Sequence, residues 1–458
     1  MASISSLGVG SGLDLTGLLD QLESAERMKL SPISAQQTTN KSKISAYGSL
    51  QGALTKLQTA AAKLAEAKTY QGQTSSITGS GVKVAATSDA VAGSYQVQVT
   101  ELAQAQSLAV SGVLDKTAAM AGTGTLTIAV GSAAPLDVTI AEGSSLEGIR
   151  DAINAKKGGV TASIVNDGSA TPYRLVLSSN STGTESEMTV SYAGSGDHAT
   201  RFGYDSASHT GVMSQTVQAK DAALTVNGVS ITSQSNTVEG ALQGVTLTVS
   251  EKGGAGQTLT VARDTAAIKS AVSGFADAYN ALVSTVSSLN SYDAESQTAG
   301  TLLGDSTLRS VQNRVRSVLT SAVGGDLNTL TDIGLTLQLD GTLKGDSERL
   351  DELVAGDLSA LSTFFAGSGA DGGFAGKMDS ALEDILADSG VLDNAIDGLK
   401  ARNESLAERY TRMETTIDAT IERYRTQFAS LDTLIAQMNS TSSYLTQQFD
   451  ALNAQLGK

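Results

Sequence analysis

The sequence predicts an α+β multidomain protein whose terminal helices pair as a coiled-coil or helical-bundle leg. This leg carries a central antiparallel β-rich head of two small domains. Near both ends, hydrophobic residues recur at alternating steps of three and four, the spacing of one helix face. Between about Ile77 and Val261 they alternate with polar residues, which is typical of strands with one buried face. The 458 residues, at about 150 per domain, give a prior of roughly three domains.

The composition excludes several classes of protein. With 31 basic and 47 acidic residues, the net charge of −16 argues against a nucleic-acid partner, which would require a basic patch. The chain has no cysteine, and therefore neither disulfides nor thiolate zinc sites. No apolar run approaches 18 residues, so we expect no membrane insertion. Residues 1–15 lack the basic and apolar regions of a cleavable signal peptide, so we expect a cytosolic protein or export by another route.

Two helical signals lie near the N-terminus. Ser11-x-x-Asp14 has the form of a capping box and precedes a leucine-rich helix that includes Leu15, Leu19 and Leu22. A heptad-like stripe follows and stops before the Gly- and Ser-rich residues 70–81. We expect this stripe to form the N-terminal leg helix, with contacts at Tyr47, Leu50, Leu54, Leu57 and Leu64.

The middle of the chain contains a hairpin and a mixed module. In Leu224–Ile231, Asn-Gly separates two alternating runs, which predicts a tight type I′ hairpin. Residues 124–179 predict strand, strand, short helix, strand and strand, with the helix over Ser145–Ala155.

Helices return after the β-rich region. Asp264 is expected to cap a helix whose stripe runs from Ile268 to Leu289. A further helix carries Leu308 to Ala322, and we expect Gly324-Gly325 to end it. The remaining predicted elements are a small hairpin over Leu335–Leu343 and two short helices, Ser347–Val354 and Asp357–Phe365.

The C-terminal stretch carries the longest hydrophobic stripe. No Pro or Gly interrupts residues 400–456, which as one helix would span roughly 85 Å. Its own domain cannot cover such a length, so the stripe needs the N-terminal helix of the same chain or other copies as partners. The predicted coiled-coil contacts are Leu406, Tyr410, Met413, Ile417, Ile421, Tyr424, Phe428, Leu431, Ile435, Met438, Leu445 and Phe449.

The sequence contains no convincing catalytic constellation. The two histidines, His198 and His209, fall in a Gly/Ser/Ala-rich loop region and are expected at the surface, without the neighbouring ligands of a metal site. The Gly8-x-Gly10-x-Gly12 run has neither the spacing nor the preceding strand of a dinucleotide fingerprint. We therefore predict a protein without catalytic, cofactor or metal sites, and not an enzyme.

Three stretches resemble one known family. They are ISSLGVGSGLD at residues 4–14 with the helix after it, GSYQVQVTELAQAQ at 93–106, and LTVNGVSI at 224–231 with GVTLTV at 244–249. Together they resemble the flagellar filament cap family, hook-associated protein two. Residues 124–179 are also similar to a module of flagellin and hook-associated proteins.

The resemblance and the periodicities together predict the domain organisation. Residues 1–42 form a flexible or helical leg segment and 43–75 the N-terminal part of the helical leg domain. The β head domain combines 76–104 and 218–264, and an outer β domain with the flagellin-like module, 105–217, is inserted in it. Residues 265–400 complete the leg domain, and 401–458 form the C-terminal coiled-coil leg.

The family resemblance implies a structural cap at the distal end of the bacterial flagellar filament. Such a cap promotes folding and insertion of exported flagellin and prevents its loss. The implied partners are flagellin, further copies in a ring (pentamer to hexamer), the hook–filament junction protein, and a dedicated export chaperone that binds the C-terminal helix. The implied location is the flagellum tip outside the cell, reached through the flagellar type III apparatus without a cleaved signal.

Two other functions stay open at this stage. One is a surface adhesin that binds host glycans or mucin through the outward β head, because the head region is poor in charge and rich in hydroxyls and amides. The other is a hook–filament junction protein, which shares helical termini and β insertions.

Overall fold

The structure, a computed structural model, describes residues 7–253, 256–356, 358–367 and 372–457. The chain divides into two compact units. The helical unit combines Met1–Ala67 with Ile268–Lys458, and the β unit is Lys68–Ala267. The predicted α+β class is confirmed, because long terminal helices enclose a sequence region of antiparallel strands.

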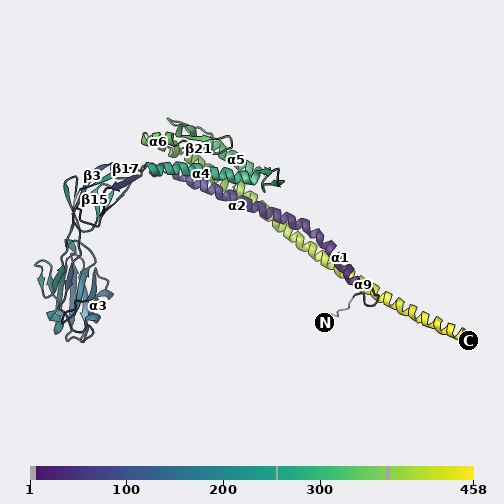
Figure 1. Cartoon of the computed structure of the whole chain (residues 1–458), viewed down its shortest axis with the longest axis horizontal. Helices are drawn as coiled ribbons and strands as arrows, with labels where there is room; N and C mark the ends of the chain where they lie inside the picture. The colour runs from purple at the N-terminus through teal and green to yellow at the C-terminus, as the bar shows by residue number, and fades with distance from the viewer. Residues whose placement is uncertain (1–6, 254–255, 357, 368–371, 458) are drawn as a thin grey trace. The chain divides into compact units, whose positions relative to one another are not determined.

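The helical unit is built from both ends of the sequence. Its longest helix, α9 (Val391–Leu456), contacts α1 and α2, and Figure 1 shows the C-terminal end of α9 continuing past α1. Short pairs, β18–β19 and β20–β21, join some of the helices. The other elements are α1 (Leu15–Arg27), α2 (Ser31–Ala65), α4 (Thr265–Asn290), β18 (Tyr292–Asp293), β19 (Thr298–Ala299), α5 (Ser306–Leu319), β20 (Leu335–Leu337), β21 (Leu343–Gly345), α6 (Ser347–Ala355), α7 (Leu358–Ala366) and α8 (Phe374–Leu386).

A phenylalanine cluster forms the centre of the helical unit. Phe374 on α8 is fully buried, and its ring centroid lies 5.6 Å from that of Phe275 on α4 and 5.7 Å from that of Phe364 on α7. Phe365 stacks edge-on against Phe364 at 4.9 Å. Four of the seven phenylalanines of the chain thus lie in one place, so this small-residue protein concentrates its aromatic packing where three helices meet.

One part of the β unit, formed by strands from its two sequence ends, is a two-sheet sandwich. One sheet has the order β1-β17-β3-β13-β14 and the other β15-β16-β2, and every pairing in them is antiparallel. Alternate valines and leucines of both sheets, such as Val97 and Leu247, fill the space between them. The strands are β1 (Gln73–Ile77), β2 (Val82–Ala86), β3 (Gly93–Glu101), β13 (Ala222–Val226), β14 (Val229–Ser233), β15 (Thr237–Leu242), β16 (Val245–Val249) and β17 (Gln257–Arg263).

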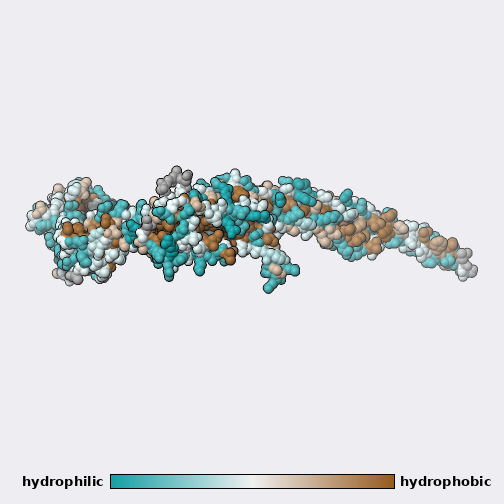
Figure 2. All heavy atoms as spheres, turned by 90° about the horizontal axis from the view of Figure 1, so that it is seen from above, coloured by the Kyte–Doolittle hydropathy of each residue, from teal (hydrophilic) through white to brown (hydrophobic). Residues whose placement is uncertain are grey.

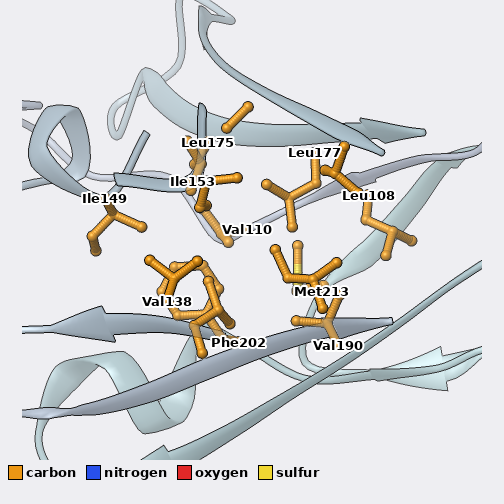
Figure 3. Close-up of a cluster of buried hydrophobic side chains, with 14 of the residues drawn as sticks. Leu108, Val110, Val138, Ile149, Ile153, Leu175, Leu177, Val190, Phe202 and Met213 are labelled. Carbon is orange, nitrogen blue, oxygen red and sulfur yellow. The ribbon is translucent and has the colours of Figure 1, made fainter. Parts of the chain in front are cut away.

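The other part of the β unit, formed by the middle of its sequence, has a hydrophobic core of its own. Its sheets have the orders β11-β10-β9-β5-β6 and β12-β4-β8-β7. In Figure 3, Leu177 of one sheet faces Val190 of the other, and Ile149 and Ile153 of α3 close the side of the cluster. The elements are β4 (Ser107–Ala109), β5 (Gly124–Val130), β6 (Leu136–Ile140), α3 (Leu146–Ala155), β7 (Val160–Asn166), β8 (Tyr173–Ser179), β9 (Met188–Gly194), β10 (Tyr204–Asp205), β11 (Thr210–Gly211) and β12 (Ser214–Val217).

Several predicted elements are confirmed. The hairpin at Asn227-Gly228 pairs Val226 with Val229, and both turn residues have positive φ, 50° and 83°. The module of two strands, helix and two strands is present as β5, β6, α3, β7 and β8, with Ser145 as the cap of α3. Asp264 accepts a hydrogen bond from the Ala267 amide at 2.9 Å, as expected of the cap of α4.

Two expectations about local structure concern the ends of short helices. The prediction that Gly324-Gly325 ends α5 is wrong, because the helix ends at Leu319, its last buried residue. The glycines instead lie in a loop that Asn328 closes by accepting from the Val323 and Gly324 amides. The predicted start of α7 at Asp357 lies outside the described residues, and the helix is described from Leu358.

The expectation that both histidines lie at the surface is wrong for His198. The short 3₁₀ turn Asp197–Thr200 directs its ring inward against Tyr192, with ring centroids 6.0 Å apart, and the residue has no exposed surface. Neither ring nitrogen has a hydrogen-bond partner within the described ranges. Burial lowers the pKa of His198. His209, in contrast, is half-exposed, with Nδ1 3.8 Å from Glu187 Oε2.

Candidate assembly surface on the helical leg

A small hydrophobic cluster joins the two ends of the chain. Leu19 and Leu30 pack with Ile417 and Ile421 of α9, and each of the four is at most 6% exposed. We call these four residues the α1–α9 cluster. The half-buried residues around it are Leu22, Tyr410, Met413, Tyr424 and Phe428.

The local sequence explains where α1 and α2 begin. Asp14 caps the helix by accepting from the Gly17 amide at 2.8 Å. The predicted capping box that begins at Ser11 is therefore wrong, since the Ser11 hydroxyl donates to Asp432 of α9 instead. Pro32 lies in the first turn of α2, where a missing amide hydrogen costs least, and a 3₁₀ turn over Met28–Leu30 precedes that helix.

Charged residues border the α1–α9 cluster. Arg27 lies 2.7 Å from Glu23 on its own helix, 3.3 Å from Asp418 and 3.7 Å from Glu414 on α9. All four side chains are at least a third exposed, so solvent screening leaves these pairs little stabilising effect. The packing of apolar residues, rather than the ion pairs, therefore holds α1 on α9.

The predicted N-terminal leg residues all lie inside the helical unit. Tyr47 is 3% exposed, and the other four have no exposed surface. Their helix, α2, contacts both α8 and α9, and Leu406 of α9 is 8% exposed. The structure therefore places Tyr47, Leu50, Leu54, Leu57 and Leu64 within one chain and leaves none of them at an open face.

The C-terminal third of α9 is different. Ile435 is half-buried, but most large apolar side chains from Leu431 onward are between 40% and 63% exposed. Figure 2 shows hydrophobic side chains gathered towards this end of the helix. We call these exposed residues the distal face of α9, and they are Leu431, Leu434, Met438, Tyr444, Leu445, Phe449 and Leu452.

Four of the seven residues of the distal face are among the contacts predicted from the sequence, namely Leu431, Met438, Leu445 and Phe449. Leu434 and Tyr444 lie off the predicted stripe and were not expected to contribute to the distal face. Leu30 was not expected in the cluster either, although it follows Leu19 by eleven residues, about three helical turns. The stripe predicted which side of α9 is apolar but gave no indication of which part of it is covered.

The described parts of the chain provide no metal-binding or membrane-spanning feature. Among them, no three His, Cys, Asp or Glu side chains lie close enough together to hold a metal ion. No helix there combines the length and the apolar character that crossing a bilayer requires. Among the described residues, the distal face of α9 places seven exposed large apolar side chains on one helix.

Comparison with known families assigns most of the chain. The family model described as "Flagellar hook-associated protein 2 N-terminus" matches residues 11–106, and the corresponding C-terminus model matches 219–440. Between them, residues 122–181 match the "Flagellin hook IN motif", which confirms the resemblance expected for residues 124–179.

Full-length relatives and a solved structure agree with this assignment. The chain is 40% identical to flagellar hook-associated protein 2 of Escherichia coli K12, with 98% of this chain and 99% of the relative aligned. It is also 40% identical to the Salmonella typhimurium protein of the same name, over 99% and 100%. The crystal structure of the flagellar cap protein FliD D1-D2-D3 domains from Escherichia coli superposes with a TM-score of 0.68 at 37% identity, over 78% of this chain and 99% of that one.

The two family models together cover well over half of the chain, and the relatives align from end to end. This chain belongs to the flagellar hook-associated protein 2 family.

Proposed function

We propose that this protein is the structural cap at the distal end of the bacterial flagellar filament, where it promotes folding and insertion of exported flagellin and prevents its loss. The family is one of structural flagellar cap proteins rather than enzymes. The observation that carries the proposal is the contrast along α9, where one apolar stripe is buried by α1 in its middle and exposed at its end.

The exposed part is large enough to bind another helix. The distal face extends from Leu431 to Leu452, which is about 33 Å of helix. Each large apolar side chain that becomes buried there contributes about 1.5–3 kcal/mol. Seven such side chains on a single unaccompanied helix are typical of an interaction site. Flagellin, whose hook motif this chain shares, is the partner that we propose for this face.

The predicted contact residues take two roles in this proposal. Leu406 to Phe428 hold the leg together within one chain, and Leu431 to Phe449 make contacts between chains. The domain boundaries given in the sequence analysis separate this leg from the head domains that form the outer plate.

Further copies of the chain complete the proposed assembly. We place the cap outside the cell at the filament tip, as a ring of five or six copies of the chain. Before export, a dedicated chaperone binds the C-terminal helix. The chain then leaves the cell through the flagellar type III apparatus. Outside the cell, the ring first contacts the hook–filament junction protein. Negative-stain images of the purified full-length chain test this part, and a lone particle at assembly concentrations would contradict it.

Charged substitutions on the distal face test the main proposal. In cells without their own cap protein, the triple variant Met438→Asp, Leu445→Asp, Phe449→Asp is expected to leave flagellin in the medium and to form no filaments. The matched control is Gln437→Asp, Gln447→Asp, Asn453→Asp, which adds the same charge at exposed polar positions of the same helix. Normal filaments from the first triple would refute the role of the distal face.

An adhesin that binds host glycans or mucin is the alternative function. The β unit has few charged residues and presents many hydroxyl and amide side chains, a surface suited to carbohydrate. A glycan-binding measurement on the full-length chain distinguishes the two functions, because the distal α9 triple would leave glycan binding unchanged. Absence of glycan binding removes this alternative.

A further inference from the structure

The segment before α1 folds into a tight turn. The Gly12 amide donates to the Gly8 carbonyl at 2.9 Å. Gly8 has φ +94°, and a Cβ at this position would lie 2.0 Å from the Leu13 carbonyl oxygen, so only glycine fits. Gly12 also has a positive φ, +73°. The backbone of this turn therefore favours glycine at Gly8 and Gly12, and we call residues Gly8–Gly12 the glycine turn.

The glycine turn holds one carboxylate of α9. The Ser11 amide donates to Asp432 Oδ1 at 2.7 Å, and the Gly10 amide donates to Oδ2 at 3.3 Å. The Ser11 hydroxyl donates to the same Oδ1. Successive backbone amides that converge on one anion form a nest, and hydrogen bonds to a charged acceptor are stronger than neutral ones.

The turn also packs closely on the next turn of α9. A Cβ on Gly10 would lie 2.9 Å from the Cβ of Ala436 and 3.3 Å from Asp432 Oδ2. Gly10 therefore lies against α9 between these two residues, and any larger side chain would push the segment away from the helix.

We propose that the glycine turn and Asp432 form a latch that fixes the register of the N-terminal segment on α9, and so sets which residues of the α9 stripe α1 covers. An apolar stripe that repeats every three or four residues does not by itself select one register, whereas a single polar contact does. Asp432 suits this role because the nearest carboxylates before and after it on α9 are Glu422 and Asp450. The latch also lies at the start of the distal face, since Leu431, next to Asp432, is 40% exposed and Met438 is 63% exposed.

The inference goes beyond the proposed function and is tested on the purified full-length chain without flagellin. Because the chain has no cysteine, Val9→Cys and Gln447→Cys provide the only two sites for spin labels, and both native residues are exposed. Gln447 lies eleven residues beyond Ala436, about 16 Å along the helix, which suits a pulsed distance measurement. Pulsed electron paramagnetic resonance is expected to give a narrow distance distribution for this pair. Asp432→Ala is expected to abolish the narrow distribution, and the control Asp450→Ala, an exposed carboxylate of the same helix, is expected to retain it.

A second variant changes the N-terminal segment instead of α9. Gly10→Val leaves α9 unchanged and is expected to detach the segment for steric reasons, so it separates loss of the latch from any effect of Asp432→Ala on the helix itself. Hydrogen exchange of the Gly10 and Ser11 amides is expected to be faster in Asp432→Ala by about tenfold or more, since both lose their acceptor. A distribution as narrow as the parent's in either variant, or unchanged exchange in Asp432→Ala, overturns the proposal.

Discussion

A charge in the α1–α9 cluster is the most direct test of how the leg is held together. Ile421 is 6% exposed and packs with Leu19, Leu30 and Ile417. Ile421→Asp removes apolar burial of about 1.5–3 kcal/mol. It also places an unpaired carboxylate in a desolvated site, which adds a cost of several kcal/mol. The expected loss, on the order of 5 kcal/mol, exceeds what the screened ion pairs of Arg27 could offset.

The expected effect is local separation of α1 from α9. The phenylalanine cluster around Phe374 and the two cores of the β unit do not include Ile421, so they are expected to stay folded. Hydrogen exchange of the full-length variant should therefore show loss of protection in Leu15–Arg27 and retained protection in α8. In cells, we expect filament growth to fail and flagellin to appear in the medium.

The matched control places the same charge on the same helix in solvent. Gln427 is exposed, so Gln427→Asp is expected to leave both α1 protection and filament growth unchanged. If Ile421→Asp retains full α1 protection and supports normal filaments, the reasoning that the cluster holds the leg together is refuted.

Three further predictions concern the cores and one turn. Phe374→Ala should destabilise the helical unit by about 3–5 kcal/mol in denaturant unfolding, because it removes a fully buried ring in contact with Phe275 and Phe364; a loss below 1 kcal/mol would contradict this packing. The lowered pKa of His198, caused by burial, means that the unfolded chain takes up a proton before the folded one. The free energy of unfolding of the β unit should therefore fall as the pH drops below about 6.5, by up to about 1.4 kcal/mol per pH unit. The fall should be smaller in His198→Phe, and an equal dependence of stability on pH in the two proteins would contradict this prediction. Gly228→Ala should cost about 1–2 kcal/mol through strain alone, since φ is +83° and nothing lies within 4 Å of the added methyl group. Asn227→Gly keeps the positive φ of the turn but removes the side-chain oxygen that accepts from the Gln96 amide at 2.8 Å, so it should cost about 1 kcal/mol through that lost hydrogen bond.

Local patterns predicted those elements whose structure depends on nearby residues. The Asn227-Gly228 hairpin was predictable because a type I′ turn requires positive φ at both positions. The α3 module was predictable because Ser145 and the spacing of Ile149 and Ile153 specify a capped amphipathic helix between strands. In these segments the backbone conformation follows from two or three neighbouring side chains.

Features that depend on distant residues were not predictable. The Ser11 capping box was a reasonable local prediction, but the hydroxyl has a stronger acceptor in Asp432, 421 residues further along the chain. His198 occurs in a loop-like sequence and is nevertheless buried, because its position is decided by packing against Tyr192 of β9. The end of α5 at Leu319 follows from burial rather than from the later glycines.

The division of the α9 stripe into covered and exposed parts shows the same limit for the candidate site. Ile421 and Phe449 occupy equivalent positions in one repeat, yet the first is 6% exposed and the second 63%. Nothing in the repeat distinguishes them, because both satisfy the spacing of one helix face. What distinguishes them is packing against the N-terminal region, since Leu19 and Leu30 cover Ile421, whereas Phe449 lies beyond Asp432 and Ala436, which Gly10 and Ser11 contact. Displacing α1 along α9 would change which residues of the stripe it covers. In the proposed latch, the position of Asp432 therefore decides which residues of the stripe α1 buries.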